Sequence, residues 1–319
     1  MNLNFLLPSP ITYIKWPFFG EVLESMNNIS IVCKRDDLIH PIISGNKWRK
    51  LSITLARLQA QKCQRIVSFG GAYSNHLHAL SYACKCLNIN LTAVIRGNHH
   101  QHLSPTLRDM VDWGSTLHFV SNIDYRRRTD KHYCENIKTR FNASDIIPEG
   151  GSSKDSLRGV ADLMSECKQQ TPDVTHILIP VASGGTLAGL LTSDALPDAE
   201  IVGIGVLKGE GYLENLVNVL ATNGGNNSGV TLMKKKWQIL HTFHHGGYAK
   251  KSDELVDFVS QFNLQFTRLS NVEKMIIEPV YSGKCFYALD QLLRAGFFPA
   301  NSKIMIVHTG GIQGARQPN

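Results

Sequence analysis

The sequence lacks the glycine signatures that mark most nucleotide-binding α/β proteins. It has no G-x-G-x-x-G after an apolar strand-like run and no G-x-x-x-x-G-K-[ST]. It also lacks a G-x-S-x-G nucleophile elbow. Dinucleotide binding, P-loop hydrolysis and serine-triad hydrolysis therefore lose their usual sequence support.

Long apolar runs are also missing, and none of the 319 residues lies in a run that could span a bilayer. The first residues, MNLNFLLPSPITYIKWPFF, lack a basic leader and a small-residue cleavage site, so we expect no signal peptide. The seven cysteines are dispersed without C-x-x-C, which disfavours a disulfide framework. We expect a cytoplasmic protein whose cysteines are buried or incidental thiols.

Signals for metal and nucleic acid are weak. Histidines gather at 96–102 and 241–248, but adjacent histidines point apart and H-E-x-x-H is absent, so we expect no metal site. The net charge of +7 would suit nucleic acid or anionic small molecules. The basic clusters at 125–128 and 234–236 are short and lack interleaved aromatics, which predicts a solvated surface and no nucleic-acid partner.

Short apolar runs alternate with helical periods from about residue 50 onward. The runs predict buried strands at 65–69, 89–95, 116–120, 176–181, 200–206 and 303–308. Apolar side chains recur at helical spacing in 48–60 and 75–87. The alternation predicts an α/β protein with open, twisted, mostly parallel sheets and helices on both faces. The strands between 60 and 120 and those after 175 predict two separate sheets, and hence two lobes.

Three predicted strands end in polar, glycine-rich turns. Residues 176–190 read as a strand, a Ser-Gly-Gly-Thr turn and a helix, an arrangement that can cradle an anion on backbone N–H groups. The alternative is a structural turn with Thr186 near the helix cap. Residues 303–314 end a strand in His-Thr-Gly-Gly. Ligands bind at strand carboxyl ends in α/β sheets, so together these turns predict a site.

The third such turn, in 65–80, places Ser74, Asn75 and His76 at the start of the next helix. These residues predict a carboxylate site, with simple helix capping as the alternative. Tyr281 follows an extended run, and its phenol could act as an acid or base if its pKa were lowered, or be an ordinary tyrosine at an edge. Lys47 follows Ser-Gly-Asn where the chain turns into a helix; taken alone it reads as a solvated lysine.

Five segments together resemble one family of enzymes: 34–51 (KRDDLIHPIISGNKWRKL), 70–76 (GGAYSNH), 183–190 (SGGTLAGL), 279–284 (PVYSGK) and 308–311 (HTGG). The family contains D-cysteine desulfhydrase and 1-aminocyclopropane-1-carboxylate (ACC) deaminase. Its members are pyridoxal-phosphate (PLP) enzymes of the tryptophan-synthase β type, also called fold type II. The resemblance spans most of the chain, with the segments in the family's order.

The resemblance assigns roles residue by residue. Lys47 matches the lysine that forms the Schiff base with PLP, and Lys50 is expected as a second cation facing the same pocket. The cofactor is further expected to contact Asn75 at its ring hydroxyl, Ser183, Gly184, Gly185, Thr186 and Leu187 at its phosphate, and Thr309. Ser74, Asn75, His76, Tyr248 and Tyr281 match substrate-binding positions, with Lys47, Ser74 and Tyr281 as catalytic residues.

The resemblance also implies a domain division and a reaction. Residues 1–50 plus 160–319 would form the larger, PLP-binding domain and 51–159 the smaller one, with PLP in the cleft between them. Ser282 and Thr309 stand where ACC deaminases typically carry Glu and Leu, as in D-cysteine desulfhydrases. A hydroxyl there makes the cofactor a weaker electron sink than a carboxylate would. The weaker sink suffices for β-elimination.

We therefore expect a lyase acting on a small D-amino acid, D-cysteine first, and a homodimer. An ACC deaminase, a lyase for another D-amino acid and a non-catalytic PLP-binding homologue stay open as alternatives.

Overall fold

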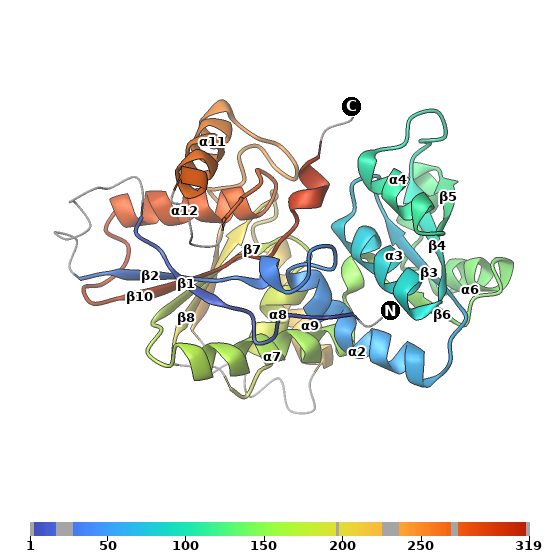
Figure 1. The fold of residues 1–319 in the computed structure, drawn as a ribbon, viewed down its shortest axis with the longest axis horizontal. Helices are drawn as coiled ribbons and strands as arrows, with labels where there is room; N and C mark the ends of the chain where they lie inside the picture. The colour runs from blue at the N-terminus through green and yellow to red at the C-terminus, as the bar shows by residue number, and fades with distance from the viewer. Residues whose placement is uncertain (1–2, 17–27, 196–197, 225–235, 269–273, 317–319) are drawn as a thin grey trace.

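The computed structural model describes residues 3–16, 28–195, 198–224, 236–268 and 274–316. Within these ranges the chain forms two β-sheets, each covered by helices, as Figure 1 shows. Residues 1–2 and 17–19 of the N-terminal stretch and 234–235 of the second basic cluster lie outside the described residues.

The larger sheet has six strands in the order β1-β2-β10-β7-β8-β9. β1 runs antiparallel to β2, and every other neighbouring pair is parallel. The strands are β1 (Ile11–Tyr13), β2 (Ser30–Lys34), β7 (His176–Val181), β8 (Glu200–Gly205), β9 (Trp237–Leu240) and β10 (Lys303–Val307). β10, the last strand in the chain, therefore lies in the middle of the sheet.

Helices cover both faces of this sheet, and strand β10 shows why its sequence is apolar throughout. Ile304 and Ile306 pack into the core under α11 and α12, while Met305 and Val307 pack on the opposite side under α7, α8 and α9. A strand buried on both faces loses the usual polar alternation. These helices are α7 (Lys154–Gln170), α8 (Gly185–Leu191), α9 (Tyr212–Gly224), α11 (Asp253–Arg268) and α12 (Ser282–Arg294).

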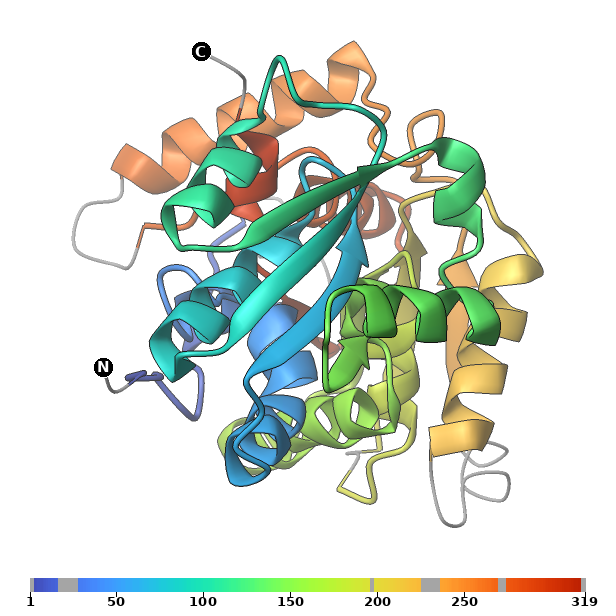
Figure 2. The same cartoon turned by 90° about the vertical axis from the view of Figure 1, so that its right-hand side faces the viewer.

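The smaller sheet has four parallel strands in the order β5-β4-β3-β6. It faces the viewer in Figure 2. Its strands are β3 (Arg65–Gly70), β4 (Asn90–Arg96), β5 (Thr116–Val120) and β6 (Asp145–Ile147). The nearby helices are α2 (Asn46–Ala60), α3 (Asn75–Leu87), α4 (Pro105–Asp112), α5 (Asn122–Arg126) and α6 (Lys131–Arg140), and short 3-10 turns span Asp36–Leu38, Glu149–Gly151 and Ile312–Ala315.

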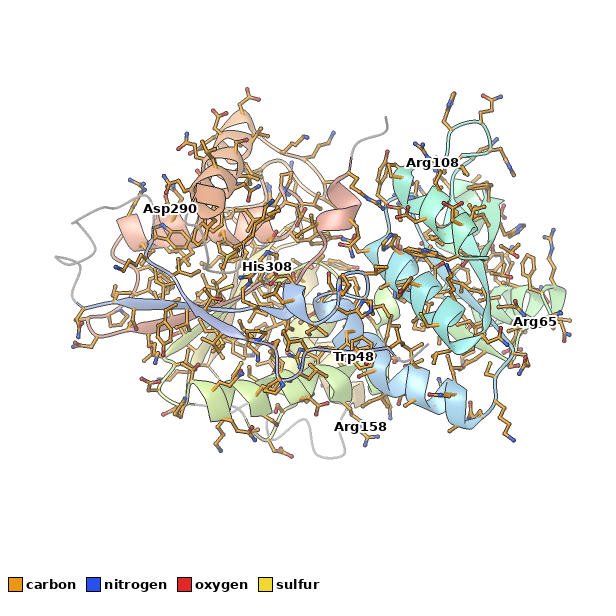
Figure 3. All side chains as sticks on the ribbon, in the orientation of Figure 1. Trp48, Arg65, Arg108, Arg158, Asp290 and His308 are labelled. Atoms are coloured by element: carbon orange, nitrogen blue, oxygen red, sulfur yellow. The ribbon has the colours of Figure 1, made fainter. Side chains whose placement is uncertain are left out.

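Helix α2 joins the two halves of the molecule. Its apolar side chains, such as Leu51 and Leu55, pack with the smaller sheet, while its N-terminus meets the end of β10. In Figure 3 the labelled Trp48 lies between Arg108 on the smaller-sheet side and His308 on the larger-sheet side.

The predicted α/β fold class is confirmed, and all six predicted strands are present with ends within one residue. Four strands were not predicted: β1, β2, β6 and β9. The domain division stays a prediction; its boundaries at 50/51 and 159/160 fall inside α2 and α7.

All seven cysteines are free thiols, five of them buried. Among the described helices, none combines the length and the apolar character needed to cross a membrane.

Candidate active site

A cavity of about 1040 Å³ opens at the carboxyl ends of strands from both sheets. The segments that follow β3, β6, β7 and β10 supply much of its wall, as does the start of α2. Parallel strands bring their carboxyl ends to one edge of a sheet, so residues far apart in sequence meet here. Of the predicted site residues, Lys47, Ser74, Asn75, His76, Ser183, Gly184, Thr186, Leu187, Tyr248, Tyr281 and Thr309 line the cavity.

A tight turn at the start of α2 directs Lys47 toward the cavity. Gly45 has φ of +64°, and a Cβ there would clash with the carbonyl of Thr309, so only glycine fits. The Asn46 N–H donates to the Thr309 carbonyl at 3.2 Å, and its side-chain amide donates to Thr186 Oγ1 at 3.1 Å. The Lys47 amine donates to Asn46 Oδ1. Three segments are thus tied together around the lysine.

The surroundings of Lys47 hold its basicity down. The side chain is partly exposed at the cavity, yet burial by the protein lowers the pKa of its amine to about 8, with Glu278 acting in the opposite direction. Burial, followed by repulsion from Lys47, lowers the pKa of Lys50 to about 7. The two amines therefore lose protons far more readily than surface lysines do.

His76 is one of the residues that line the cavity, and its ring is neutral. The Ser68 hydroxyl donates to the Ile147 carbonyl at 2.8 Å, which commits its only proton. The contact of 2.9 Å between Ser68 Oγ and His76 Nε2 must then use the proton on Nε2. Nδ1 is buried without a partner among the described residues, and burial followed by the charges of Lys47 and Lys50 lowers the pKa of His76 to about 3. His76 is therefore neutral, and its unprotonated nitrogen is buried.

Ser74 and Asn75 begin α3 at the same wall. Ser74 Oγ accepts the Leu77 N–H at 3.2 Å, so the capping alternative holds for this residue, which also lines the cavity. The Asn75 amide donates to the Gly311 carbonyl at 3.3 Å. Its Oδ1 is buried and accepts no bond from any described residue. A ligand donor can bind there.

The glycine-rich turn after β7 lines the cavity and includes backbone N–H groups that the helix does not use. Gly184 has φ of +70°, and the helical bonding of α8 starts only at the bond of 2.8 Å from the Ala188 N–H to the Gly184 carbonyl. The preceding N–H groups have no acceptor within the helix. Lys50 Nζ lies 3.3 Å from Ser183 Oγ, which adds a cation to this turn. Gly185 does not line the cavity; a Cβ there would lie 3.0 Å from Lys50 Nζ.

Two tyrosines from distant segments meet over the cavity. The hydroxyls of Tyr248 and Tyr281 lie 2.7 Å apart. Burial, and then the neighbouring Tyr248, raises the pKa of Tyr281 well above its usual range. The lowered pKa that a role as a base required is therefore not found, and Tyr281 keeps its proton.

Glu278 is a buried acid in the wall that the sequence analysis did not identify. Its carboxylate accepts the N–H groups of Val280, Tyr281 and Ser282 at 2.6, 2.8 and 2.9 Å. Burial raises the pKa of this carboxyl, and the N–H donors oppose the rise. A single acid inside the apolar run 275–280 was the available signal. Ser282 contacts Glu278 and is not among the described residues that line the cavity.

The basic cluster at 125–128 was predicted to be a solvated surface, but two of its side chains make specific contacts. Tyr125 is buried and donates to Glu149 at 2.7 Å, and Arg128 pairs with the same carboxylate at 2.5 Å. Arg128 and Glu149 both line the cavity, as does Arg96 at the end of β4.

The histidines at 241–248 bond to protein side chains: His241 bonds to Glu214 and His245 to Ser252. In the described ranges no three His, Cys, Asp or Glu residues are grouped to hold a metal ion.

A family model described as pyridoxal-phosphate dependent enzyme matches residues 12–310. The chain therefore belongs to this family of enzymes and depends on PLP.

Three relatives show the extent of the similarity. A protein of Pyrococcus abyssi, provisionally named ACC deaminase, is 26% identical over 313 residues, which cover 95% of this chain and 92% of the relative. The bifunctional D-cysteine desulfhydrase/ACC deaminase of Arabidopsis thaliana is 27% identical over 326 residues, covering 97% and 77%. The crystal structure of an ACC deaminase homologue superposes with a TM-score of 0.78 at 25% identity, covering 98% and 91%.

The residues of the cavity fit the cofactor. Lys47 would supply an amine of lowered pKa for its aldehyde, and the Ser183–Leu187 turn with Lys50 would supply N–H groups and a cation for its phosphate. The buried Asn75 Oδ1, which has no partner among the described residues, would supply a polar contact for the ring.

Proposed function

We propose that this enzyme is a lyase that eliminates the β-substituent of a small D-amino acid, with D-cysteine as the first choice. For D-cysteine the overall reaction consumes one water and yields pyruvate, ammonia and hydrogen sulfide. One observation carries the proposal: a single cavity holds the Lys47 amine, the Asn75 amide, the Ser183 turn and the Tyr248–Tyr281 pair. PLP, when bound, supplies the electron sink that makes the Cα proton of an amino acid removable.

Lys47 is the group that would hold PLP and move the Cα proton. With its pKa lowered to about 8, about one tenth of the amine is unprotonated at pH 7 and can accept a proton, far more than for an ordinary lysine. Its bond to Asn46 Oδ1 fixes its direction of approach. Lys50, on the next turn of the same helix, would face the phosphate rather than the reacting carbon, because it lies against Ser183.

The start of α3 would hold the substrate carboxylate. Ser74 and Asn75 place a hydroxyl and an amide at the cavity, and the first N–H groups of α3 lie beside them. His76 is neutral, with Nε2 bonded to Ser68 and Nδ1 buried, so it would be a weaker partner for the carboxylate than Ser74 or Asn75. Tyr281, which keeps its proton, would be placed to donate it to the leaving group.

ACC deaminase activity is the second candidate, and Glu278 is the observation in its favour. A carboxylate near the cofactor ring would strengthen the electron sink that ring opening demands. However, both carboxyl oxygens of Glu278 already accept backbone N–H groups before α12, which points to a structural role. Thr309, 5% exposed, supplies a hydroxyl at the cavity instead. D-cysteine therefore remains our first choice.

The test is a panel of D-cysteine, L-cysteine, D-serine, β-chloro-D-alanine and ACC with purified holoenzyme. We expect sulfide and pyruvate in equal amounts from D-cysteine, faster than from L-cysteine, and no 2-oxobutanoate from ACC. 2-Oxobutanoate from ACC without sulfide from D-cysteine would establish the deaminase instead. A protein that binds PLP but turns over no member of the panel would overturn the proposed substrate class.

We further propose a cytoplasmic homodimer that binds no nucleic acid. Seven free thiols suit a reducing compartment. Partner acids for several cationic side chains, such as Glu149 for Arg128 and Asp109 for Arg316, argue against a free basic face. Light scattering and a DNA-retention assay at low and moderate salt test these points; a monomer or salt-sensitive retention would contradict them.

A further inference from the structure

The segment between β9 and α11 carries Tyr248 on a contorted backbone. φ is positive at His245 (48°), Gly246 (94°), Gly247 (126°) and Ala249 (56°). His245 and Ala249 have a Cβ, and a side chain in this region of φ raises the conformational energy. Such a backbone persists only where surrounding contacts hold it.

Lys284 supplies two of those contacts, beside the bonds of His245 to Ser252 and of Tyr248 to Tyr281. It is fully buried, at 0% exposure, on the first turn of α12. Its ammonium donates to the carbonyls of Val206 at 3.1 Å, His244 at 2.8 Å and Gly247 at 2.9 Å. An ammonium has three N–H donors, so all of them are used, and two of them bond the contorted segment.

The arrangement differs from that of the other fully buried lysine in the larger half, Lys34. Lys34 Nζ lies 2.6 Å from a carboxylate oxygen of Glu166 and forms an ion pair. The Lys284 ammonium bonds three carbonyls instead, and its pKa is lowered to about 8 by burial, with Glu278 opposing. Burying a cation costs free energy, and neutral carbonyls compensate for this cost less than a carboxylate does. A buried lysine bonded only to carbonyls therefore suggests a role in fixing a particular backbone geometry.

The geometry it fixes is that of the tyrosine pair. Lys284 stands three residues after Tyr281, so α12, which Tyr281 directly precedes, also bonds the segment that carries Tyr248. The two hydroxyls meet at 2.7 Å although 33 residues separate them.

We propose that Lys284 is a positioning residue: its ammonium holds the 244–248 segment against α12 and so places the Tyr248 hydroxyl on that of Tyr281. The turnover part of this inference rests on the proposed function, whereas the placement of the segment does not.

A double-mutant cycle tests the proposal. Lys284→Met keeps the length of the side chain and removes its donors. We expect Lys284→Met and Tyr248→Phe each to lower kcat about tenfold, and Tyr248→Phe to change kcat by less than about twofold in the Lys284→Met background. Independent, multiplying effects would overturn the positioning role. Lys303→Met, which removes a lysine paired with Asp173 at the opposite end of β10, is the matched control.

A second measurement needs no substrate. Amide hydrogen exchange of the holoenzyme, read by mass spectrometry, should accelerate in 244–250 in Lys284→Met and stay unchanged there in Lys303→Met. Unchanged exchange in that segment would refute the proposal whatever the substrate. Accelerated exchange with no turnover of any D-amino acid by the wild type would instead refute the proposed function alone.

If Lys284→Met fails to fold, Gly247→Ala perturbs the acceptor end. A Cβ at Gly247 has room, with its nearest neighbour, Lys208 Cγ, at 4.0 Å, so the change strains only the backbone at φ of +126°. The same loss of the Tyr248→Phe effect is expected in this background, and a full Tyr248→Phe effect would contradict the proposal.

Discussion

The Tyr248 hydroxyl lies 2.7 Å from the Tyr281 hydroxyl. Both tyrosines line the cavity, and Tyr248 is half exposed. Both protons cannot lie on the shared line between the oxygens, so one tyrosine donates to the other. The donor's proton is thereby committed, and the acceptor's remains available for a ligand.

Removing either hydroxyl should slow turnover without unfolding the enzyme. Tyr281→Phe is expected to lower kcat about a hundredfold, because a positioned proton donor contributes about 10²–10⁴-fold. Tyr248→Phe should cost less, since it acts through its neighbour. Steady-state kinetics with D-cysteine measures both, and Tyr212→Phe, 61% exposed on α9, is the control. Wild-type kcat in Tyr281→Phe would exclude it from catalysis.

Lys47 should be indispensable for cofactor attachment. Lys47→Ala is expected to lose the visible absorbance band of the bound cofactor and nearly all turnover, because no other amine occupies its place on the turn after Gly45. Lys85→Ala, an exposed lysine on α3, should retain both. PLP that stays covalently attached to Lys47→Ala after borohydride reduction, as read by mass spectrometry, would assign the attachment to another lysine.

Lys50 should make the stability of the apoenzyme depend on pH. Its folded-state pKa of about 7 lies below the usual 10.5, so the unfolded chain binds more protons between these values and stability rises with pH across that window. Lys50→Met should therefore stabilise the apoenzyme at pH 7 and lose this advantage by pH 10. Urea unfolding at both pH values measures the difference; Lys85→Met is the control. If the difference in unfolding free energy between Lys50→Met and the wild type were the same at both pH values, the lowered pKa would be refuted.

Substituting two glycines that have nearly the same φ should distinguish the cost of backbone strain from the cost of a steric clash. Gly296 has φ of +63° with open space around it, whereas Gly45 has φ of +64° against Thr309. Gly296→Ala should cost about 1 kcal/mol, the usual cost of a left-handed residue with a Cβ. Gly45→Ala should cost several times more and abolish PLP binding, as read from urea unfolding and absorbance. Equal costs would mean that the turn can shift away from β10.

Much of the larger pattern was predictable because its physical signals are local. Strands such as β7 and β10 are buried on both faces and read as continuous apolar runs. β1 and β6 have three residues each, too few for any period to show, and their pairing depends on partners distant in sequence. Propensity alone does not detect such short strands.

The site was predictable where one residue type in one turn does the work, as with Lys47. Contacts between segments were not. Nothing local tells that Glu278 turns back onto the next N–H groups, that Tyr248 meets Tyr281, or that Lys284 bonds carbonyls near residues 206 and 244. Likewise the pKa of Tyr281 depends on how deeply the fold buries it, which no motif encodes.

The central position of β10 makes the turn that carries Lys47 depend on a strand distant from it in sequence. The strand lies between β2 and β7. Thr309, two residues after its end, accepts the N–H of Asn46, the residue before Lys47. The carbonyl that binds this turn is therefore in place only when β10 lies between β2 and β7 and residues 308–309 follow it in their folded positions.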